Sequence, residues 1–244
     1  MAGEGGRAYE QDLYTKMNQA GVVPEGFTPA GSDSSAPDII FFANRGERYH
    51  LELKNSSKLL DFGQSVIHHN GTSWEFKGTN PVMVEMLTEL GVMNVVTTNW
   101  TEVPHKRTRQ SVTKPEAIQD IINFPDITAS ADVDNVIRYY NNKMWRGRGT
   151  FYIQIENLGL YYMGSNPANI PGIPELSGSF EVRVRRKPSG STREDPDLTA
   201  ALLGTGRKAK LPSPLRSYGF TTAFVCTSLP AASPINLDDI ENWL

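Results

Sequence analysis

The chain has 244 residues, 39% of them hydrophobic and 21% charged, and a net charge of −3, a composition that excludes disorder along its whole length. Its one cysteine, Cys226, excludes an intrachain disulfide and a cysteine-based zinc site, which fits a reducing compartment. The N-terminus carries no apolar signal segment, and no run approaches the ~18 apolar residues of a membrane helix. We therefore expect a soluble, cytoplasmic protein without membrane contact.

The first half of the chain alternates helical and strand patterns. Tyr9, Leu13 and Met17 recur at helical spacing, and the sequence Asn44-Arg45-Gly46 is typical of a three-residue hairpin loop. Asn70-Gly71 is a strong signal for a two-residue turn. The predicted elements are, in order, a helix over 7–20, a loop over 22–37, strands over 38–43 and 47–54, a hairpin over 64–76, a helix over 80–90 and a buried strand over 91–98.

The second half is richer in Pro, Gly, Ser and Arg. Its predicted elements are a helix over 131–142, a hairpin over 150–163 with Gly159 near its middle, a strand over 179–187 and a last strand over 219–227. Helices alternating with hairpins indicate a mixed α/β fold. We expect one domain over 1–244, with a core at about 7–163, a loop-rich basic elaboration at about 164–216, and a final strand and acidic tail over 217–244.

Two carboxylates and a lysine are expected to meet in the first hairpin. Period-two geometry places Glu52 and Lys54 on the same face of their strand. A three-residue loop pairs Ala43 with Glu47, so that Asp38 lies directly opposite Glu52, with Cβ atoms roughly 5 Å apart. A two- or four-residue loop would shift the register by one residue and send the carboxylates to opposite faces. The glycine at position 46 favours the first arrangement.

Converging carboxylates repel one another unless a cation or a proton lies between them. Mg²⁺ prefers oxygen ligands, and Asp38, Glu52 and the Leu53 carbonyl would supply three. Such an ion polarises a phosphodiester and lowers the pKa of a bound water. Lys54 could position that water or stabilise charge on the phosphate. The pattern therefore predicts phosphodiester hydrolysis with Mg²⁺, for which Mn²⁺ is expected to substitute.

Pro37-Asp38 followed by Glu52-Leu53-Lys54 resembles the PD-(D/E)XK motif of restriction-endonuclease-like nucleases. Glu10 in the first helix and Gln64 after the lysine are similar to further site residues of that superfamily, and the resemblance covers roughly residues 7–76. It implies a central mixed β-sheet flanked by helices, a divalent metal and a nucleic-acid substrate, usually DNA. It also implies catalytic roles for Glu10, Asp38, Glu52, Lys54 and Gln64.

Three functions stay open at this point. The size of the chain suits a sequence-specific restriction enzyme. The helix glutamate and the loop after it also resemble Holliday-junction resolvases, which are smaller and more basic. From another class, the chain could be a non-catalytic DNA-binding or assembly module, which the intact carboxylates and lysine disfavour. Because two-strand cleavage needs two active sites, we also expect a homodimer.

Basic residues are concentrated in the second half, where 17 of the 24 Lys and Arg residues lie between Lys106 and Arg216. We expect them to contact the phosphates of double-stranded DNA rather than its bases. The candidate DNA-binding residues are Arg107, Arg109, Arg146, Arg148, Arg183, Arg185 and Lys208. The apolar residues of the acidic C-terminal segment, which begins at Ile235, are expected to pack on the protein itself rather than on a partner.

Overall fold

The structure, a computed structural model, describes residues 4–29, 36–43, 46–55, 61–77, 80–107, 112–188, 192–196, 200, 210–212 and 218–239. The chain divides into two compact units, each interleaved with the other in sequence. The first unit comprises Met1–Phe62, Asp132–Phe180 and Val225–Leu244, and the second comprises Gly63–Ala131 and Glu181–Phe224. The expectation of one nuclease domain over 1–244, with the internal boundaries given above, stays a prediction.

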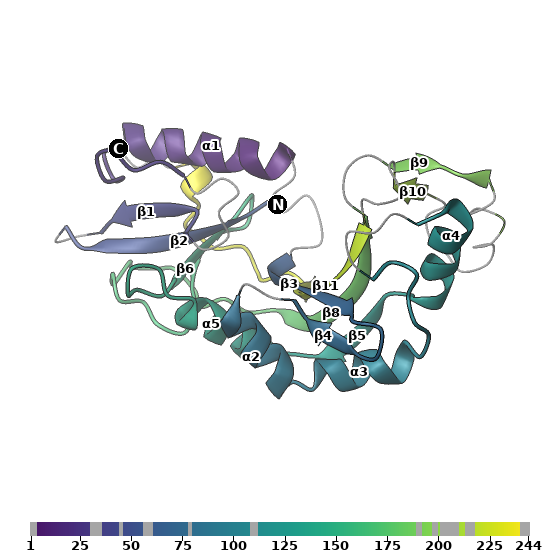
Figure 1. Ribbon diagram of the computed structural model, residues 1–244. Coiled ribbons are helices and arrows are strands. Elements are labelled where there is room, and N and C mark those ends of the chain that lie inside the picture. The colour runs from purple at the N-terminus through teal and green to yellow at the C-terminus, as the bar shows by residue number, and fades with distance from the viewer. Residues whose placement is uncertain are drawn as a thin grey trace. The chain divides into compact units, whose positions relative to one another are not determined.

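The first unit is built on a four-stranded mixed sheet, as expected for the fold class (Figure 1). The strand order is β1-β2-β6-β7, in which β2 runs antiparallel to β1 but parallel to β6. The bounds are β1 Ile39–Phe42, β2 Arg48–Lys54, β6 Tyr152–Ile155 and β7 Gly159–Tyr162. Strand β2 is therefore an interior strand, and of its charged residues Glu52 is buried, Lys54 is half-buried and Arg48 is exposed.

Two helices flank this sheet, α1 (Glu4–Gln19) on one face and α5 (Val133–Asn142) on the other (Figure 1). Leu13 and Met17 of α1 share one buried cluster with Leu51 and Leu53 of β2. The even-numbered residues of β2 point to the opposite face, because side chains alternate along a strand. That face receives Tyr140 of α5. The Asp132 side chain begins α5 by accepting a hydrogen bond from the N–H of Asn135, in a capping box.

The register predicted for the first hairpin is confirmed. Ile39 pairs with Leu51 and Phe42 with Arg48, and the Ala43 N–H donates to the Glu47 carbonyl at 3.2 Å. Gly46 has a φ of +73°, the left-handed conformation expected of the glycine that closes this loop. Continuing the ladder by one pair places Asp38 opposite Glu52.

Most residues of a five-stranded sheet of order β4-β3-β11-β8-β5 belong to the second unit (Figure 1). The bounds are β3 Asp61–His69, β4 Trp74–Phe76, β5 Ile127–Ser130, β8 Ser179–Pro188 and β11 Tyr218–Ser228. A two-stranded sheet joins β9 (Thr192–Glu194) and β10 (Lys210–Pro212). The helices are α2 Pro81–Glu89, α3 Val92–Asn99 and α4 Lys114–Asn123. Rings of Trp74, Trp100, Phe124 and Phe220 form an aromatic cluster in this unit.

The prediction of a strand over 91–98 is wrong, because Val92–Asn99 forms helix α3. Val92 and Val96 are fully buried and Trp100 is 1% exposed, a spacing of four residues that fits one helical face. Packing of this face against α2, β4 and β5 overrides the strand preference of the valines. Gly91, with a φ of +66°, separates α3 from α2.

The hairpin over 64–76 is confirmed, but its turn is longer than the two residues expected. His69 pairs with Trp74, and the Asn70 N–H donates to the Ser73 carbonyl at 3.0 Å. The Asn70 side chain also accepts from the N–H groups of Thr72 and Ser73, which stabilises a four-residue turn. Helix α4 and strand β5 were not predicted from the sequence, although Thr113 and Glu116 form a capping box at the start of α4.

The C-terminal segment packs on the first unit as expected, within residues 235–239. Leu237 belongs to the buried cluster of α1 and the sheet, and Tyr9 donates a 2.8 Å hydrogen bond to Asp238. Cys226 is buried, as a core residue should be. Among the described residues, no helix is both long and apolar enough to cross a membrane.

Candidate active site

Asp38, Glu52 and Lys54 lie together on one face of the first unit, at the end of the β1–β2 ladder away from its turn. The Lys54 Nζ donates to Glu52 Oε1 at 2.6 Å. The Leu53 N–H donates to Asp38 Oδ2 at 2.8 Å, which holds the Asp38 side chain against the edge of β2. Glu52 is 8% exposed and Asp38 is half-buried. The hairpin therefore brings together the three charged groups that the sequence pattern predicted.

Two aromatic residues enclose this charged group, and neither was predicted from the sequence. The Tyr140 hydroxyl donates to Glu52 Oε1 at 3.0 Å. The Lys54 Nζ lies 5.5 Å from the ring centroid of Phe62 and 5.8 Å from that of Tyr140. A cation is attracted to aromatic faces at such distances. Tyr140 and Phe62 therefore fix both Glu52 and Lys54, yet no local pattern marks them, because they reach the site through tertiary packing.

The electrostatics of the site favour one proton or one cation between the two carboxylates. Burial, and next the negative charge of Glu52, raise the pKa of Asp38 from its ordinary 3.8 to about 7. Burial would also raise the pKa of Glu52, but the charges of Lys54 and Lys143 outweigh it, so that this pKa is lowered. Burial opposes the charge on Lys54, but Glu52 and Asp38 outweigh that effect and raise its pKa. Near neutral pH the pair therefore carries Glu52 ionised and Asp38 partly protonated.

Glu10 lies in α1, is 6% exposed, and is close enough to add a small upward contribution to the pKa of Asp38. A third carboxylate of the first unit therefore acts electrostatically on Asp38. Its role in catalysis stays a prediction.

The residues of this site fit a magnesium ion by their donor chemistry. Within the described part of the chain, no hydrogen bond engages Asp38 Oδ1 or Glu52 Oε2, so each carboxylate retains an oxygen for a ligand. The N–H and C=O of a strand residue point to the same side, so the Leu53 carbonyl opens toward Asp38. No group of three or more His, Cys, Asp or Glu side chains suited to a metal occurs among the described residues. Two carboxylates and one carbonyl nevertheless match the way Mg²⁺ binds, since it keeps several waters.

Gln64 belongs to the second unit. Its side-chain oxygen accepts a 2.7 Å hydrogen bond from Lys187 Nζ, a partner that the sequence did not suggest. Its role in catalysis stays a prediction.

The candidate DNA-binding arginines are distributed over both units. Arg107 is exposed in the second unit, and Arg183 and Arg185 lie half-buried on one face of β8, where Val182 and Val184 occupy the other. Arg146 and Arg148 lie in the first unit, in the turn after α5. Arg109 and Lys208 lie outside the described residues.

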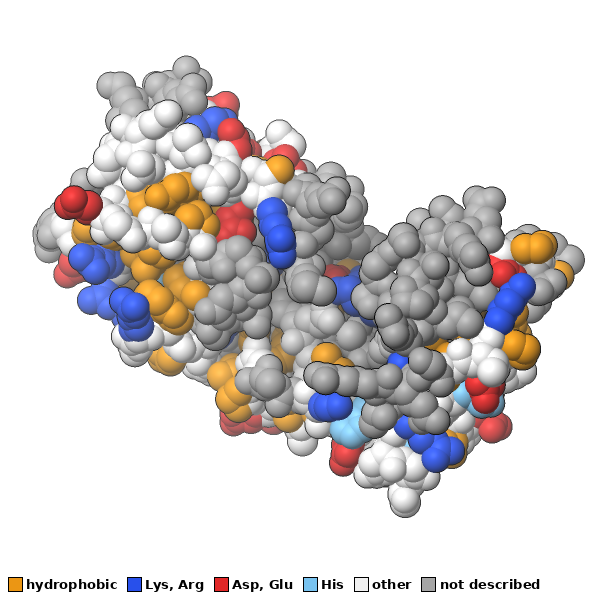
Figure 2. Space-filling view, turned by 45° about the horizontal axis from the view of Figure 1, so that its top comes forward, with side chains coloured by type: hydrophobic (Ala, Val, Ile, Leu, Met, Phe, Trp, Pro, Cys, Tyr) orange, Lys and Arg blue, Asp and Glu red, His pale blue; other side chains and the backbone are white. Residues whose placement is uncertain are grey.

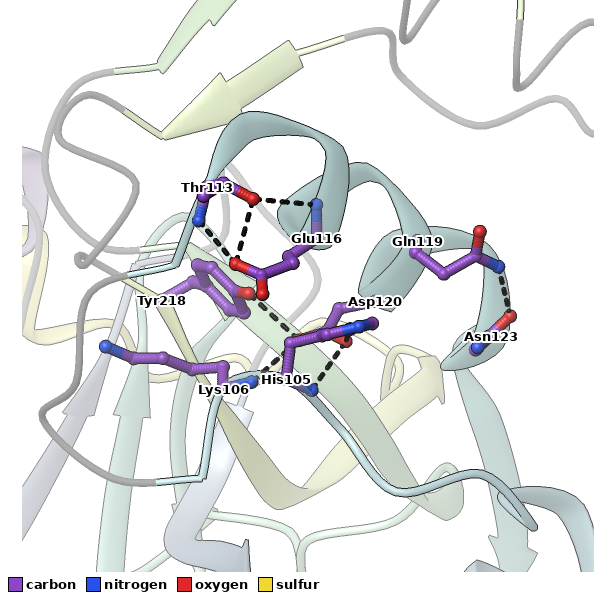
Figure 3. Close-up of polar contacts among 8 residues, drawn as sticks. All are labelled: His105, Lys106, Thr113, Glu116, Gln119, Asp120, Asn123 and Tyr218. Carbon is purple, nitrogen blue, oxygen red and sulfur yellow. Dashed lines mark hydrogen bonds and ion pairs between the residues drawn. The ribbon is translucent and has the colours of Figure 1, made fainter.

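A buried aspartate organises the segment that presents Arg107 in the second unit (Figure 3). Asp120 is fully buried and accepts hydrogen bonds from the backbone N–H groups of His105 and Lys106, both at 3.0 Å. Tyr218 donates to it at 2.9 Å, and the His105 ring contacts it at 2.8 Å. Because Arg107 follows these residues directly, Asp120 of α4 holds the start of a basic segment in one conformation.

Comparisons with known proteins add little to this geometry. No family model matches the sequence, and no curated protein sequence matches it. Among solved structures, an HhaI endonuclease in complex with DNA aligns over 96% of this chain and 96% of its own, with 14% identity and a TM-score of 0.42. We draw no conclusion about this chain from a likeness of that size.

Proposed function

We propose that this protein is a metal-dependent endonuclease of the PD-(D/E)XK type that hydrolyses DNA phosphodiester bonds. The observation that carries the proposal is the convergence of Asp38, Glu52 and Lys54 on one face of an interior strand. Burying such groups costs several kcal/mol per ion, and a buried ion pair stabilises a fold little or not at all. Their presence beside β2 is therefore better explained by chemistry than by stability.

Each residue has a distinct role in the proposed reaction. Asp38, Glu52 and the Leu53 carbonyl hold Mg²⁺, which when bound supplies polarisation of the phosphodiester and a lowered pKa of the attacking water. Lys54 places its ammonium group where negative charge develops on the phosphate. Tyr140 holds the Glu52 and Lys54 side chains in position, because its hydroxyl donates to the same Glu52 oxygen that Lys54 contacts. Glu10 and Gln64 are proposed to support the site.

Cleavage of supercoiled plasmid DNA tests the proposal. Wild-type protein is expected to cut with Mg²⁺ or Mn²⁺ and not with a chelator present. Lys54→Met keeps the apolar stem but removes the charge, and a loss of about 10²–10³-fold is expected by analogy with other charge-stabilising groups. Lys77→Ala, at an exposed lysine of the second unit, is the matched control and should cut like wild type. Activity that survives both Asp38→Asn and Glu52→Gln would contradict the assignment.

The choice of substrate separates the narrower functions. Linear duplex, four-way junction and single-stranded substrates distinguish a restriction-type enzyme from a junction resolvase. A nicked product points to one active site at a time, whereas a linear product supports the proposed homodimer. No cleavage of any substrate, together with no Mn²⁺ binding by calorimetry in the presence of DNA, would instead favour a non-catalytic DNA-binding module.

A further inference from the structure

A pocket of about 310 Å³ opens in the first unit, and one of its lining residues, Pro37, directly precedes Asp38 in the chain. It is lined by the loop of residues 24–28, by Ala36, Pro37 and Ile40 before and on β1, and by Arg48, Trp145 and Arg146. Pockets of roughly 300–1,000 Å³ are the size that holds small organic ligands. The proposed hydrolysis of the phosphodiester does not use this pocket.

The wall of the pocket combines an aromatic ring with two cations. The Arg146 guanidinium carbon lies 4.3 Å from the Trp145 ring centroid, so the two side chains form a stacked pair. His50 packs against the same indole at 5.4 Å and 72°, which supports it from the sheet. Arg48 lies at the start of β2 and lines the same space. An aromatic–arginine stack beside a second arginine is the arrangement that receives a nucleobase and its phosphate.

The turn that carries the stacked pair is held in place by the backbone. Trp145 and Arg148 exchange hydrogen bonds of 2.9 and 3.1 Å, and Arg146 adopts a φ of +49° between them. The Arg148 side chain donates to the Arg48 carbonyl at 2.6 Å, which ties the turn to β2. Over the end of the unit that carries β1 and the β1–β2 turn, Lys and Arg side chains lie beside an apolar patch (Figure 2). The hydrogen bonds of the turn therefore hold the Trp145–Arg146 stack in place before any ligand binds.

The pocket lies on the same face of the sheet as the candidate metal ligands. Ile40 is two residues from Asp38 on β1, and Arg48 is four residues from Glu52 on β2, so period-two geometry places all four on one face. Two strand residues span about 6.8 Å, which is on the order of the step between successive phosphates of a nucleic-acid strand, and the four residues from Arg48 to Glu52 span about 13.6 Å. A phosphate at Arg48 would thus lie about two steps along the strand from the phosphate at Asp38 and Glu52.

We infer that this pocket binds one unpaired nucleotide of the substrate, with its base on the Trp145–Arg146 stack and its phosphate at Arg48. A base can reach the stack only when it is outside a duplex, because paired bases are covered by their neighbours. Glu25, an acidic residue among the described residues of the lining, supplies an acceptor for an exocyclic amino group. The inference rests on the proposed function for the identity of the polymer, but the pocket itself can be tested without cleavage.

Equilibrium binding of deoxyadenosine monophosphate, followed by NMR titration of the full chain, tests the pocket. Loss of a base–aromatic stack corresponds to about 5–150-fold weaker binding, which is expected for Trp145→Leu. Deoxyribose 5-phosphate, which lacks the base, should bind more weakly to wild type and should be insensitive to Trp145→Leu, but sensitive to Arg48→Gln. Met144→Ala is the matched control, since Met144 is 61% exposed, adjoins Trp145 and does not line the pocket.

Three results would overturn the inference. The first is no measurable binding of deoxyadenosine monophosphate to wild type. The second is equal affinity of wild type for deoxyadenosine monophosphate and deoxyribose 5-phosphate. The third is unchanged nucleotide affinity in Trp145→Leu, in a sample whose thermal unfolding matches that of wild type. If Trp145→Leu fails to fold, Arg146→Gln and Arg48→Gln, both at exposed positions, take its place. Unchanged nucleotide affinity in these two variants would overturn the inference. Plasmid cleavage without nucleotide binding would refute the pocket alone, and nucleotide binding without cleavage would refute only the proposed function.

Discussion

Replacing Asp38 with asparagine is expected to stabilise the metal-free protein above neutral pH while abolishing cleavage. The pKa of this carboxyl is raised to about 7 in the folded protein from an ordinary value of 3.8, first by burial and then by Glu52. The folded state therefore holds the proton more tightly than the unfolded chain does. The contribution of this group to stability is complete below about pH 4, falls as the pH rises from about 4 to 7, and is lost above about 7.

The size of the expected stabilisation follows from the rise in the pKa of Asp38. A shift of about three pKa units corresponds to about 4 kcal/mol, and solvent screening of the partly exposed carboxylate reduces this to roughly 2–4 kcal/mol. Asparagine keeps an oxygen that can accept the Leu53 N–H but carries no charge to repel Glu52. We therefore expect Asp38→Asn to raise the free energy of unfolding by roughly 2–4 kcal/mol near pH 8, and by less than about 1 kcal/mol near pH 4.

Urea unfolding with a chelator present, followed by circular dichroism at several pH values, measures this difference. Asp132→Asn is the control. It replaces the carboxylate that caps α5 with an amide that can also cap the helix, so the free energy of unfolding should show no such gain at high pH. Excess Mg²⁺ should reduce the difference in the free energy of unfolding between Asp38→Asn and wild type, because it stabilises wild type alone. If Asp38→Asn is equally or less stable than wild type near pH 8, burial and the charge of Glu52 do not raise the pKa of Asp38 as described.

Three further substitutions test other parts of the structure. Tyr140→Phe keeps the ring but removes the hydrogen bond to Glu52, and we expect the cleavage rate or the metal affinity to fall about 10- to 100-fold; unchanged kinetics would exclude a positioning role. Asp120→Asn replaces an acceptor with a donor facing buried N–H groups, and a loss of about 3 kcal/mol or more in urea unfolding is expected, whereas a neutral result would contradict its role in Figure 3. Tyr9→Phe should cost about 1 kcal/mol and speed hydrogen exchange over residues 235–239, and unaltered exchange there would show that this hydrogen bond does not hold the segment.

The central feature of the candidate site could be derived from local rules. The turn length, the glycine at position 46 and the period of two residues together place Asp38 opposite Glu52, and the same period places Lys54 beside Glu52. These relations depend on residues close in sequence, whose geometry is set by the covalent chain and by one hairpin. For that reason the register could be predicted before any tertiary contact was known.

Other parts of the fold and site depend on contacts between distant residues. The strand expected over 91–98 is helix α3, because burial of Val92, Val96 and Trp100 outweighs the local preference of β-branched residues. The partner of Gln64 is Lys187, 123 residues away in the chain. No periodicity in a single sequence carries that pairing.

By itself, then, the sequence determined which charged groups share one strand face and that the fold mixes helices with sheets. Only the tertiary structure decided what surrounds them: Tyr140, 88 residues from Glu52 in the chain, and Phe62 beside Lys54. The same holds for the pocket formed by Trp145, Arg146 and Arg48. The physical reason is that strand period and turn geometry act over a few residues, whereas burial and packing act between segments that the folded chain brings together.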